Sequence, residues 1–388
     1  KEAIQSFMDY YGDQDIMIFS VPGKCEIGGN HTDHQQGRVL ASAIQLDSIG
    51  IVAKQDRYVK VIYNELNINE IDTENIKYNE AKKGTMESLI NGVLFGLNQK
   101  NYHIGGFNAY IQCDIPRNVG LGSSANFNIM IGTIINYLYN EGKIENKYLV
   151  QIGRFATNIF YCKPSGLMNE CVCCVGGFIK VDFRDPNSPD IYKLNTDFSN
   201  FDYTLCCVNS NVCRSDNTID YDAIPKEMIK VANFFKKDVL RDVSYDGFME
   251  NYRIVRARVG DRPALRALHF FKEEDRVLKQ TEALEKGDFD TFLKLVRESG
   301  DSTFKALQNI YPQESTRHQN IGTAIVLSEN FLGEDGVVKV NGGGFSSTMI
   351  AFVKTSVIND YAAYMDSIFG KGSCYIIHTR EQGAIRLL

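Results

Sequence analysis

Polar residues suited to binding hydroxyl groups are concentrated in one short segment near the start of the chain. The segment reads Pro22-Gly23-Lys24-Cys25-Glu26-Ile27-Gly28-Gly29-Asn30-His31-Thr32-Asp33-His34 and follows a predicted strand. Such a density of polar groups suits a core poorly, because a buried polar group without a partner costs about 1 to 3 kcal/mol. Asp33 can accept from two neighbouring hydroxyls, and Asn30 and His31 can donate or accept. The segment therefore indicates hydroxyl recognition, with a turn capped by Asp33 or Asn30 as the alternative.

A glycine-rich turn before a predicted helix is a candidate anion site. It covers Pro116–Asn126, and the helix is expected over Ser124–Tyr139. Unpaired backbone N–H groups at the positive end of a helix dipole bind anions, so phosphate is the expected ligand. The alternative is an ordinary N-cap at Ser123 or Ser124. The turn lacks the closing Gly-Lys-Ser/Thr of a Walker loop, which argues against a P-loop NTPase.

A third cluster, Asn341-Gly342-Gly343-Gly344-Phe345-Ser346-Ser347, lies between two predicted strands near the C-terminus. Three successive glycines imply close approach of the backbone to another group. A tight hairpin explains the same residues equally well.

The elements that must position these clusters predict an α+β protein. Alternating or apolar runs predict strands at Ile16–Phe19, Ile49–Ala53, Tyr58–Tyr63, Phe107–Cys113, Tyr203–Val208, Val337–Val340 and Thr348–Val353. Three- and four-residue periodicity predicts further helices at Thr85–Asn98, Lys147–Phe160, Pro225–Phe235, Phe248–Arg258, Glu274–Glu285 and Phe289–Glu298. The loop-like stretch Arg184–Asp190 is expected to separate two domains, residues 1–190 and 191–388.

Composition and charge narrow the class of protein. The chain has 388 residues, of which 44% are apolar and 23% charged, the balance of an ordinary globular protein. A net charge of -6 without long like-charge runs argues against nucleic acid or an anionic membrane as a partner. No stretch reaches the roughly 20 apolar residues of a membrane span, and the first segment lacks the apolar stretch of a secretory signal. We expect a cytoplasmic protein.

Ten cysteines without the spacing of a secreted scaffold predict reduced thiols. Three of them lie in the run Cys171-Val172-Cys173-Cys174, which contains a CxxC and leads into a turn and an alternating strand. Small thiols packed in the core are the favoured interpretation, and a redox pair or half of a zinc site is the alternative.

The three clusters, in this order, resemble the motifs of the GHMP small-molecule kinases. The first is similar to the galactokinase signature Pro-Gly-Arg-x-Asn-x-Ile-Gly-Glu-His-Thr-Asp-Tyr, and the second contains the family phosphate-loop core Gly-Leu-Gly-Ser-Ser-Ala. The third resembles Gly-Gly-Gly-Phe-Gly-Gly with both final glycines replaced by serine. Similar segments continue through Lys163–Asn169, Asn209–Tyr221 and Arg276–Glu298. The resemblance implies a two-domain fold of mixed sheets packed with helices, with the active site in the cleft between the domains.

The implied activity is transfer of the γ-phosphoryl group of ATP to the anomeric hydroxyl of galactose or a related monosaccharide. The resemblance places ATP on the phosphate loop, which consists of Gly120, Leu121, Gly122, Ser123, Ser124 and Ala125, with Mg²⁺ on Ser124 and, weakly, on Thr157. It places the sugar against Asn30, His31, Asp33, Gly166 and Tyr221.

Several positions depart from the family pattern. Lys24 replaces an arginine beside the reacting groups and keeps the cation without the guanidinium fork. Asn169 replaces a carboxylate proposed as general base and cannot accept a proton near neutral pH. Thr157 replaces a glutamate that binds magnesium. On the sugar side, Asn30 replaces a glutamate and His34 replaces a tyrosine.

Two functions are consistent with this pattern. In the first, the protein is a sugar kinase that relies on positioning and Lys24, because a loose transition state needs little help from a base. In the second, the losses at Thr157 and Asn169 leave a catalytically impaired protein that binds sugar, nucleotide or both as a sensor or regulator.

Overall fold

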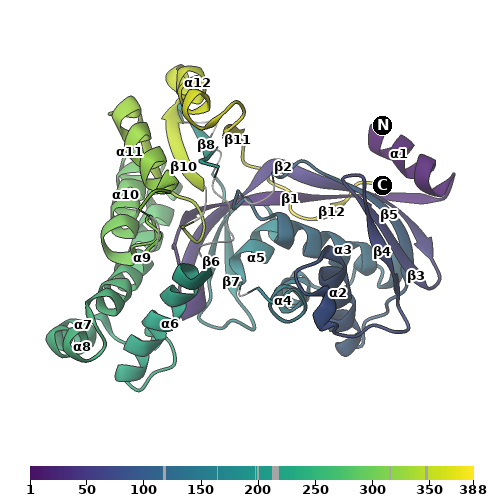
Figure 1. Cartoon of the computed structure of the whole chain (residues 1–388), viewed down its shortest axis with the longest axis horizontal. Helices are drawn as coiled ribbons and strands as arrows, with labels where there is room; N and C mark the ends of the chain where they lie inside the picture. The colour runs from purple at the N-terminus through teal and green to yellow at the C-terminus, as the bar shows by residue number, and fades with distance from the viewer. Residues whose placement is uncertain are drawn as a thin grey trace.

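The structure is a computed structural model that describes residues 1–116, 119–163, 165–196, 198, 201–211, 218–313, 316–345 and 348–388. These residues form two β-sheets covered by helices, side by side in Figure 1. The first sheet has the order β12-β1-β2-β5-β3-β4, and β6 joins it through β2 and carries β7. The second has the order β11-β8-β10-β9.

Within the first sheet β3 and β5 are parallel, whereas the other neighbours are antiparallel. Its strands are β1 (Ile16–Gly28), β2 (Arg38–Gln55), β3 (Tyr58–Tyr63), β4 (Leu66–Asp72), β5 (Gly106–Cys113), β6 (Phe178–Asp182), β7 (Asp190–Leu194) and β12 (Ile385–Arg386). The second sheet is antiparallel and contains β8 (Tyr203–Asn209), β9 (Gly336–Val340), β10 (Thr348–Lys354) and β11 (Cys374–Ile377).

Strand alternation decides which helices cover which face of the first sheet. Ile51 and Tyr110 pack with Phe7 of α1 on one face, whereas Val52 and Ile111 point into the larger core on the other. The helices of this half are α1 (Glu2–Tyr11), α2 (Met86–Gln99), α3 (Ser123–Tyr139), α4 (Asn146–Phe155) and α5 (Met168–Val175). Figure 1 shows α2 to α5 gathered below the sheet and α1 above its far end.

The second half is richer in helices, with α9 as the longest. Its helices are α6 (Thr218–Phe234), α7 (Tyr245–Glu250), α8 (Tyr252–Arg258), α9 (Asp261–Glu285), α10 (Phe289–Ser302), α11 (Asn320–Leu332) and α12 (Ile358–Phe369). The main core is continuous between the halves, since Phe292 of α10 and Phe352 of β10 belong to the same cluster as Ile27 of β1. The two halves are therefore joined by one packed core, to which β1 contributes Ile27.

The predicted elements are present, with several local differences. The helix expected over Glu274–Glu285 is the end of α9, which already begins at Asp261. The first polar cluster was expected to follow a strand, but its first seven residues, from Pro22 to Gly28, are the end of β1. The helix expected over Phe248–Arg258 is two helices that meet at Asn251. The helix expected over Lys147–Phe160 is α-helical to Phe155 and then a π-helical turn, η3 (Ala156–Phe160).

The two sheets also bear on the predicted domain division. β7 begins at the predicted boundary and pairs with β6, and β12 returns from the C-terminus to pair with β1. The division into 1–190 and 191–388 stays a prediction. Among the described residues, no helix is long and apolar enough to cross a membrane.

The cysteine run lies within α5 and not in a loop. Cys171, Cys173 and Cys174 are buried, unpaired and part of the main core. Burial raises the pKa of the Cys174 thiol to about 12, which keeps it protonated. The run therefore packs as small apolar side chains, as predicted. Cys213 lies outside the described residues.

Candidate active site

The first two clusters are in direct contact across β1. The backbone N–H of Lys24 donates to the carbonyl of Leu121 at 2.9 Å, so the glycine-rich loop of the second cluster is bonded to β1, which carries the start of the first cluster. Glycines permit this approach: a Cβ on Gly23 would lie 2.9 Å from the Leu121 carbonyl oxygen, and one on Gly122 would lie 2.8 Å from Lys24 Cγ. Lys24 is thereby held between the two predicted ligand sites.

The helix after the loop begins without a side-chain cap. Its N-cap is Gly122, with φ 86, and no side chain accepts a bond from its first turn. The alternative explanation of this cluster, a serine N-cap at Ser123 or Ser124, is therefore wrong. Left-handed backbone favours glycine, and the turn leaves the first N–H groups of α3 to another acceptor. This arrangement suits a phosphate.

A buried asparagine fixes the start of α3 against β1. Asn126 Nδ2 donates to the carbonyls of Val21 at 2.6 Å and Pro22 at 3.1 Å, and Asn126 Oδ1 accepts from Ser48 Oγ at 2.5 Å. The amide is completely buried. Because every bond crosses between elements, Asn126 positions the phosphate loop, a role that its place at the end of the second motif did not reveal.

The turn after β1 is closed by its own backbone and by Thr32. Gly29 and His31 have φ of 82 and 58, and Thr32 Oγ1 donates to the Gly29 carbonyl at 2.8 Å. The short helix η1 (Asp33–Gln35) follows. These left-handed positions turn the chain so that His31 and Asp33 face different neighbours.

Asn30 is held by three hydrogen bonds within the protein. Its Nδ2 donates to Glu26 Oε1 at 2.6 Å and to the Gly342 carbonyl at 2.5 Å, and its Oδ1 accepts from Asn309 Nδ2 at 2.8 Å. The residue is completely buried. Since both amide protons are used, this geometry gives no support to the predicted contact between Asn30 and a sugar.

The third cluster contacts the first through the bond between Asn30 and the Gly342 carbonyl. Its loop starts at Asn341, whose Oδ1 accepts from the Glu26 N–H at 3.4 Å. The glycines do lie in a β9–β10 hairpin, and Gly343 also permits close approach, because a Cβ there would lie 2.8 Å from Tyr221 Cδ2. The predicted close approach of the backbone is therefore confirmed at Gly343. The β9–β10 connection has six residues between Asn341 and Thr348 and is longer than a tight hairpin; two of them, Ser346 and Ser347, lie outside the described residues.

A directed chain of hydrogen bonds runs through the histidines. His31 Nε2 is 2.8 Å from the Gly343 carbonyl, which can only accept, so this nitrogen carries the proton. His31 Nδ1 then accepts from His34 Nε2 at 3.2 Å. His34 Nδ1 accepts from Gln35 Nε2 at 3.3 Å, and Gln35 Oε1 accepts from the Leu240 N–H at 3.0 Å. Both imidazoles are neutral in this arrangement, and burial lowers the pKa of His31 to about 4.

The His31 ring also lies 5.5 Å from the ring of Tyr221, so these two predicted sugar contacts adjoin each other. Both ring nitrogens of His31 have protein partners. A sugar hydroxyl can bind His31 only by replacing one of them.

Asp33 is placed by Gly166, another predicted sugar contact. A Cβ on Gly166 would overlap Asp33 Oδ2 and lie 2.6 Å from its Cγ, so only glycine admits the carboxylate here. Asp33 Oδ1 accepts from the His34 N–H at 2.9 Å. Burial is the main cause that raises the pKa of Asp33 to about 6, with the charge of Glu26 acting in the same direction. Asp33 is therefore ionised at neutral pH and can accept hydroxyl protons.

Lys24 and Asn169 bring unused polar atoms to the same region. Lys24 is 3% exposed, and its side-chain ammonium forms no hydrogen bond or ion pair with the part of the chain described. Asn169 Oδ1 is buried and has no hydrogen-bond partner among the described residues. One cation and one acceptor are thus available to a ligand.

The residues at the predicted magnesium site fit the ion unequally. The Thr157 hydroxyl is buried, accepts from Asn128 Nδ2 at 2.8 Å and donates to the Gly153 carbonyl at 3.2 Å. These bonds occupy it within the protein, so Thr157 does not fit as a direct ligand. Ser124, in the uncapped first turn of α3, fits better, because Mg²⁺ in such sites takes few protein ligands and is held largely by phosphates and water.

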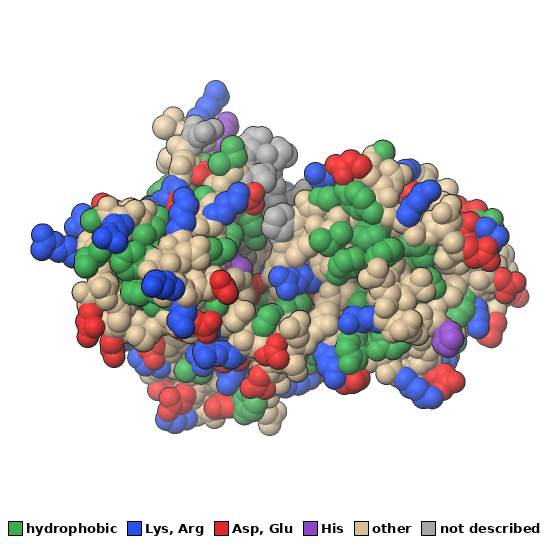
Figure 2. Space-filling model, turned by 90° about the horizontal axis from the view of Figure 1, so that it is seen from below, with side chains coloured by type: hydrophobic (Ala, Val, Ile, Leu, Met, Phe, Trp, Pro, Cys, Tyr) green, Lys and Arg blue, Asp and Glu red, His purple; other side chains and the backbone are tan. Residues whose placement is uncertain are grey.

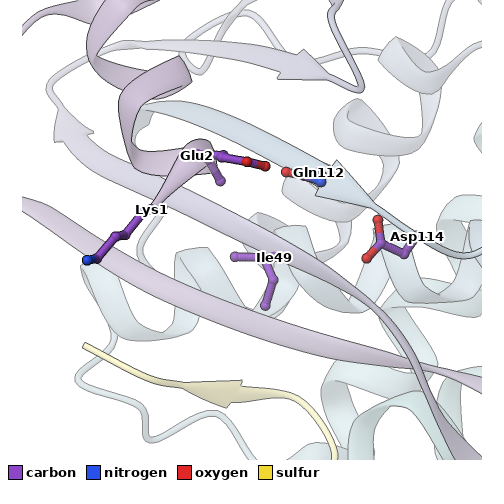
Figure 3. A pocket seen from close by; sticks show the side chains of 6 residues that line it. Lys1, Glu2, Ile49, Gln112 and Asp114 are labelled. Atoms are coloured by element: carbon purple, nitrogen blue, oxygen red, sulfur yellow. The ribbon is translucent and has the colours of Figure 1, made fainter.

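Other surface features are separate from this region. A hollow of about 430 Å³ at the start of α1 is lined by Lys1, Glu2, Ala3, Ile49, Gln112 and Asp114, none of which is a predicted site residue (Figure 3). On the face shown in Figure 2, basic and acidic side chains are interspersed over both halves.

Two family models match separate parts of the chain. Residues 5–54 match the galactokinase galactose-binding signature, and residues 88–177 match the GHMP kinase N-terminal domain. The crystal structure of Lactococcus lactis galactokinase complexed with galactose superposes with a TM-score of 0.85 at 20% identity, covering 99% of this chain and 98% of that one. Mevalonate kinase of Methanococcus jannaschii gives 0.65 at 17% identity, covering 95% and 99%. The chain therefore has the GHMP kinase fold, and its residues 5–54 carry the galactokinase galactose-binding signature.

Proposed function

We propose that this protein transfers the γ-phosphoryl group of ATP to the anomeric hydroxyl of galactose or a related monosaccharide. The observation that carries the proposal is the bond between the Lys24 N–H and the Leu121 carbonyl, at 2.9 Å. It joins the strand that leads to Asp33 with the uncapped phosphate loop, and it leaves the Lys24 ammonium between them. The galactose of the Lactococcus lactis complex and the signature match support a sugar as acceptor.

The roles of the chain's own residues follow from their atoms. The N–H groups of the loop at Gly122–Ala125 bind phosphate oxygens, and Ser124 would hold Mg²⁺, which neutralises charge on the triphosphate when bound. Lys24 places a positive charge beside the transferred group. Asp33 accepts from sugar hydroxyls and so fixes the orientation of the ring.

Asn169 has an orienting role in this proposal. Its free Oδ1 can accept a hydrogen bond from the attacking hydroxyl but cannot remove its proton near neutral pH. Phosphoryl transfer through a loose transition state depends mainly on positioning and charge stabilisation. As the bond between the anomeric oxygen and the γ-phosphorus forms and the bond to the β-phosphate oxygen breaks, ADP leaves and the hydroxyl proton passes to an oxygen of the transferred phosphoryl group. Lys24 is then the principal catalytic group, and the missing carboxylate limits the rate.

The proposed reaction suits a cytoplasmic protein with ATP and Mg²⁺ as its cofactors. The described cysteines are unpaired and mostly buried, as expected in a reducing compartment. The proposed site lies between residues 1–190 and residues 191–388, because Tyr221 and Gly343 of the second half approach His31 of the first.

A two-stage experiment tests the proposal. Calorimetry first measures binding of ATP–magnesium and of a monosaccharide panel, and ADP release is then measured with each sugar that binds. We expect sugar-dependent ADP release that Lys24→Ala abolishes. The matches to kinases do not favour the binding-only alternative, which would give tight binding without ADP release.

A further inference from the structure

One buried carboxyl beside the proposed site has no role in the mechanism above. Glu170 follows Asn169 in α5 and is 1% exposed, and its Oε2 has no hydrogen-bond partner among the described residues. An ionised carboxylate in such a position is costly, because burial without a partner charge penalises the charged form. The described residues give it no ion pair, although Arg154 and Lys24 are near enough to affect it.

A second unpartnered oxygen lies close to this carboxyl. Asn128, in α3 one turn beyond Ser124, is 1% exposed, and its Oδ1 lacks a partner in the same part of the chain. Both side chains pack on Gly153 of α4: a Cβ there would lie 3.0 Å from Glu170 Cγ and 3.5 Å from Asn128 Cβ. Two buried acceptors without a partner among the described residues thus belong to side chains that share Gly153 as a neighbour.

Exchanging the oxygen and nitrogen of the Asn128 amide would not give its Oδ1 a donor. Its Nδ2 donates to the Gly153 carbonyl at 3.0 Å and to Thr157 Oγ1 at 2.8 Å. The Gly153 carbonyl is only an acceptor, so a flipped amide would set two oxygens against each other. The Asn128 Oδ1 must therefore stay an acceptor, and a protonated Glu170 beside the same glycine is a candidate donor.

We propose that Glu170 is a neutral carboxylic acid whose proton is donated to Asn128 Oδ1, and that this bond fastens α5, which carries Asn169, to α3, which carries the phosphate loop. Glu170 is then a positioning residue and not a replacement for the missing base. One proton satisfies both orphan oxygens, whereas its loss would leave a carboxylate facing a carbonyl oxygen. The bond would hold the two walls of the site in register without adding a charge to it.

The charged surroundings of Glu170 agree with this assignment. Burial is the largest effect and raises the pKa of Glu170 to about 8. Arg154 of α4 and Lys24 of β1 act in the opposite direction, together with the residue's own backbone N–H, and Asp33 of η1 raises the pKa further. The carboxyl is therefore protonated at neutral pH and ionises on the alkaline side.

The first test measures stability against pH and needs no activity. In the unfolded chain Glu170 ionises near its ordinary pKa of 4.5, so between about pH 5 and 8 only the folded protein keeps this proton. We therefore divide the unfolding equilibrium constant of the wild type by that of Glu170→Gln. This ratio should rise about tenfold for each pH unit in this window, because the wild type loses stability as the pH rises, and it should level off above the window. The control Glu145→Gln removes an exposed carboxyl and should keep the wild-type slope. Equal slopes in wild type and Glu170→Gln would overturn the proposal.

A second test addresses the pair itself. In a double-mutant cycle of Glu170→Ala and Asn128→Ala, the coupling should be favourable at pH 6 and unfavourable at pH 9. If either alanine variant fails to fold, the Glu170→Gln comparison still decides. A coupling that is independent of pH, or that depends on added Na⁺, K⁺ or Mg²⁺, would show that a cation or simple packing joins the residues and would contradict the shared proton.

The kinetic test rests on the proposed function. Glutamine keeps a donor at this position, so Glu170→Gln should have the wild-type kcat at pH 7. One pH unit above the pKa of Glu170, the kcat of the wild type should fall roughly tenfold, whereas that of Glu170→Gln should not. Loss of turnover in a folded Glu170→Gln protein would identify Glu170 as the base and overturn the proposal. If no sugar supports turnover in the wild type, the proposed function fails while the stability test still judges Glu170.

Discussion

Replacing Gly166 with alanine tests whether Asp33 is the sugar-binding carboxylate. The new Cβ would lie 2.6 Å from Asp33 Cγ, whereas carbon atoms in contact are about 3.5 to 4.0 Å apart. Asp33 must therefore withdraw by about 1 Å or more. The backbone itself does not require glycine here, since Gly166 is absent from the positive-φ residues. The damage should thus be confined to the carboxylate.

The expected loss follows from the hydrogen bonds that Asp33 can make. A charge-assisted hydrogen bond contributes roughly 1.5 to 3 kcal/mol, so losing one weakens binding by about 10- to 150-fold. Calorimetry should show this weakening for galactose and an unchanged affinity for ATP–magnesium. The control is Asp33→Ala, to which Gly166→Ala should add nothing in the double variant. Unchanged galactose affinity, or additive effects in the double variant, would refute the assignment.

Three further predictions concern other parts of the site. Lys24→Ala should lower kcat by about 10²- to 10³-fold in an ADP-release assay while the fold is retained, because it removes a cation proposed to lie beside the transferred group; a smaller change would show that another group stabilises the transferred charge. Asn126→Ala should lower the free energy of unfolding by about 2 to 4 kcal/mol in denaturant titrations and weaken ATP more than sugar, since it breaks three buried bonds between α3, β1 and β2. Galactose affinity should fall as the pH drops below about 6, because burial raises the pKa of Asp33 to that value and protonation removes an acceptor; Asp33→Asn should abolish this dependence, which calorimetry across pH 5 to 8 would check.

The sequence was most informative where a short pattern determines local structure. β3 runs over Tyr58–Tyr63 as predicted, and the phosphate-loop turn precedes α3 as predicted. Alternation and a glycine-rich turn act over a few residues, so no distant contact is needed to recognise them. The order of the three clusters was sufficient to indicate the family.

The features of the site that the sequence did not predict depend on contacts between residues far apart in the chain. Asn30 reads as a polar residue in a binding motif, yet its bonds to Asn309 and Gly342 commit it to holding the third loop. The pairing of β12 with β1 has no signal in either segment alone. Glu170 carries no mark in the sequence because its pKa depends on burial, which only the packing of three helices creates.

Local errors had similar causes. The serines of the phosphate loop have good N-cap propensity, but the left-handed Gly122 takes the cap position. The helical pattern of Lys147–Phe160 continues without a break in the sequence, whereas in the structure the π-helical turn ends with a bond from the Tyr161 N–H to the Ala156 carbonyl, at 2.9 Å. Propensity describes single residues, whereas these outcomes were decided by tertiary contacts.

The most direct test of the central claim is identification of the product by ³¹P NMR after incubation with galactose, ATP and Mg²⁺. We predict equal amounts of ADP and a sugar phosphate bearing phosphorus on the anomeric oxygen, both absent with Lys24→Ala. Galactose that binds without forming any phosphorylated sugar, or a product phosphorylated at another hydroxyl, would contradict the account.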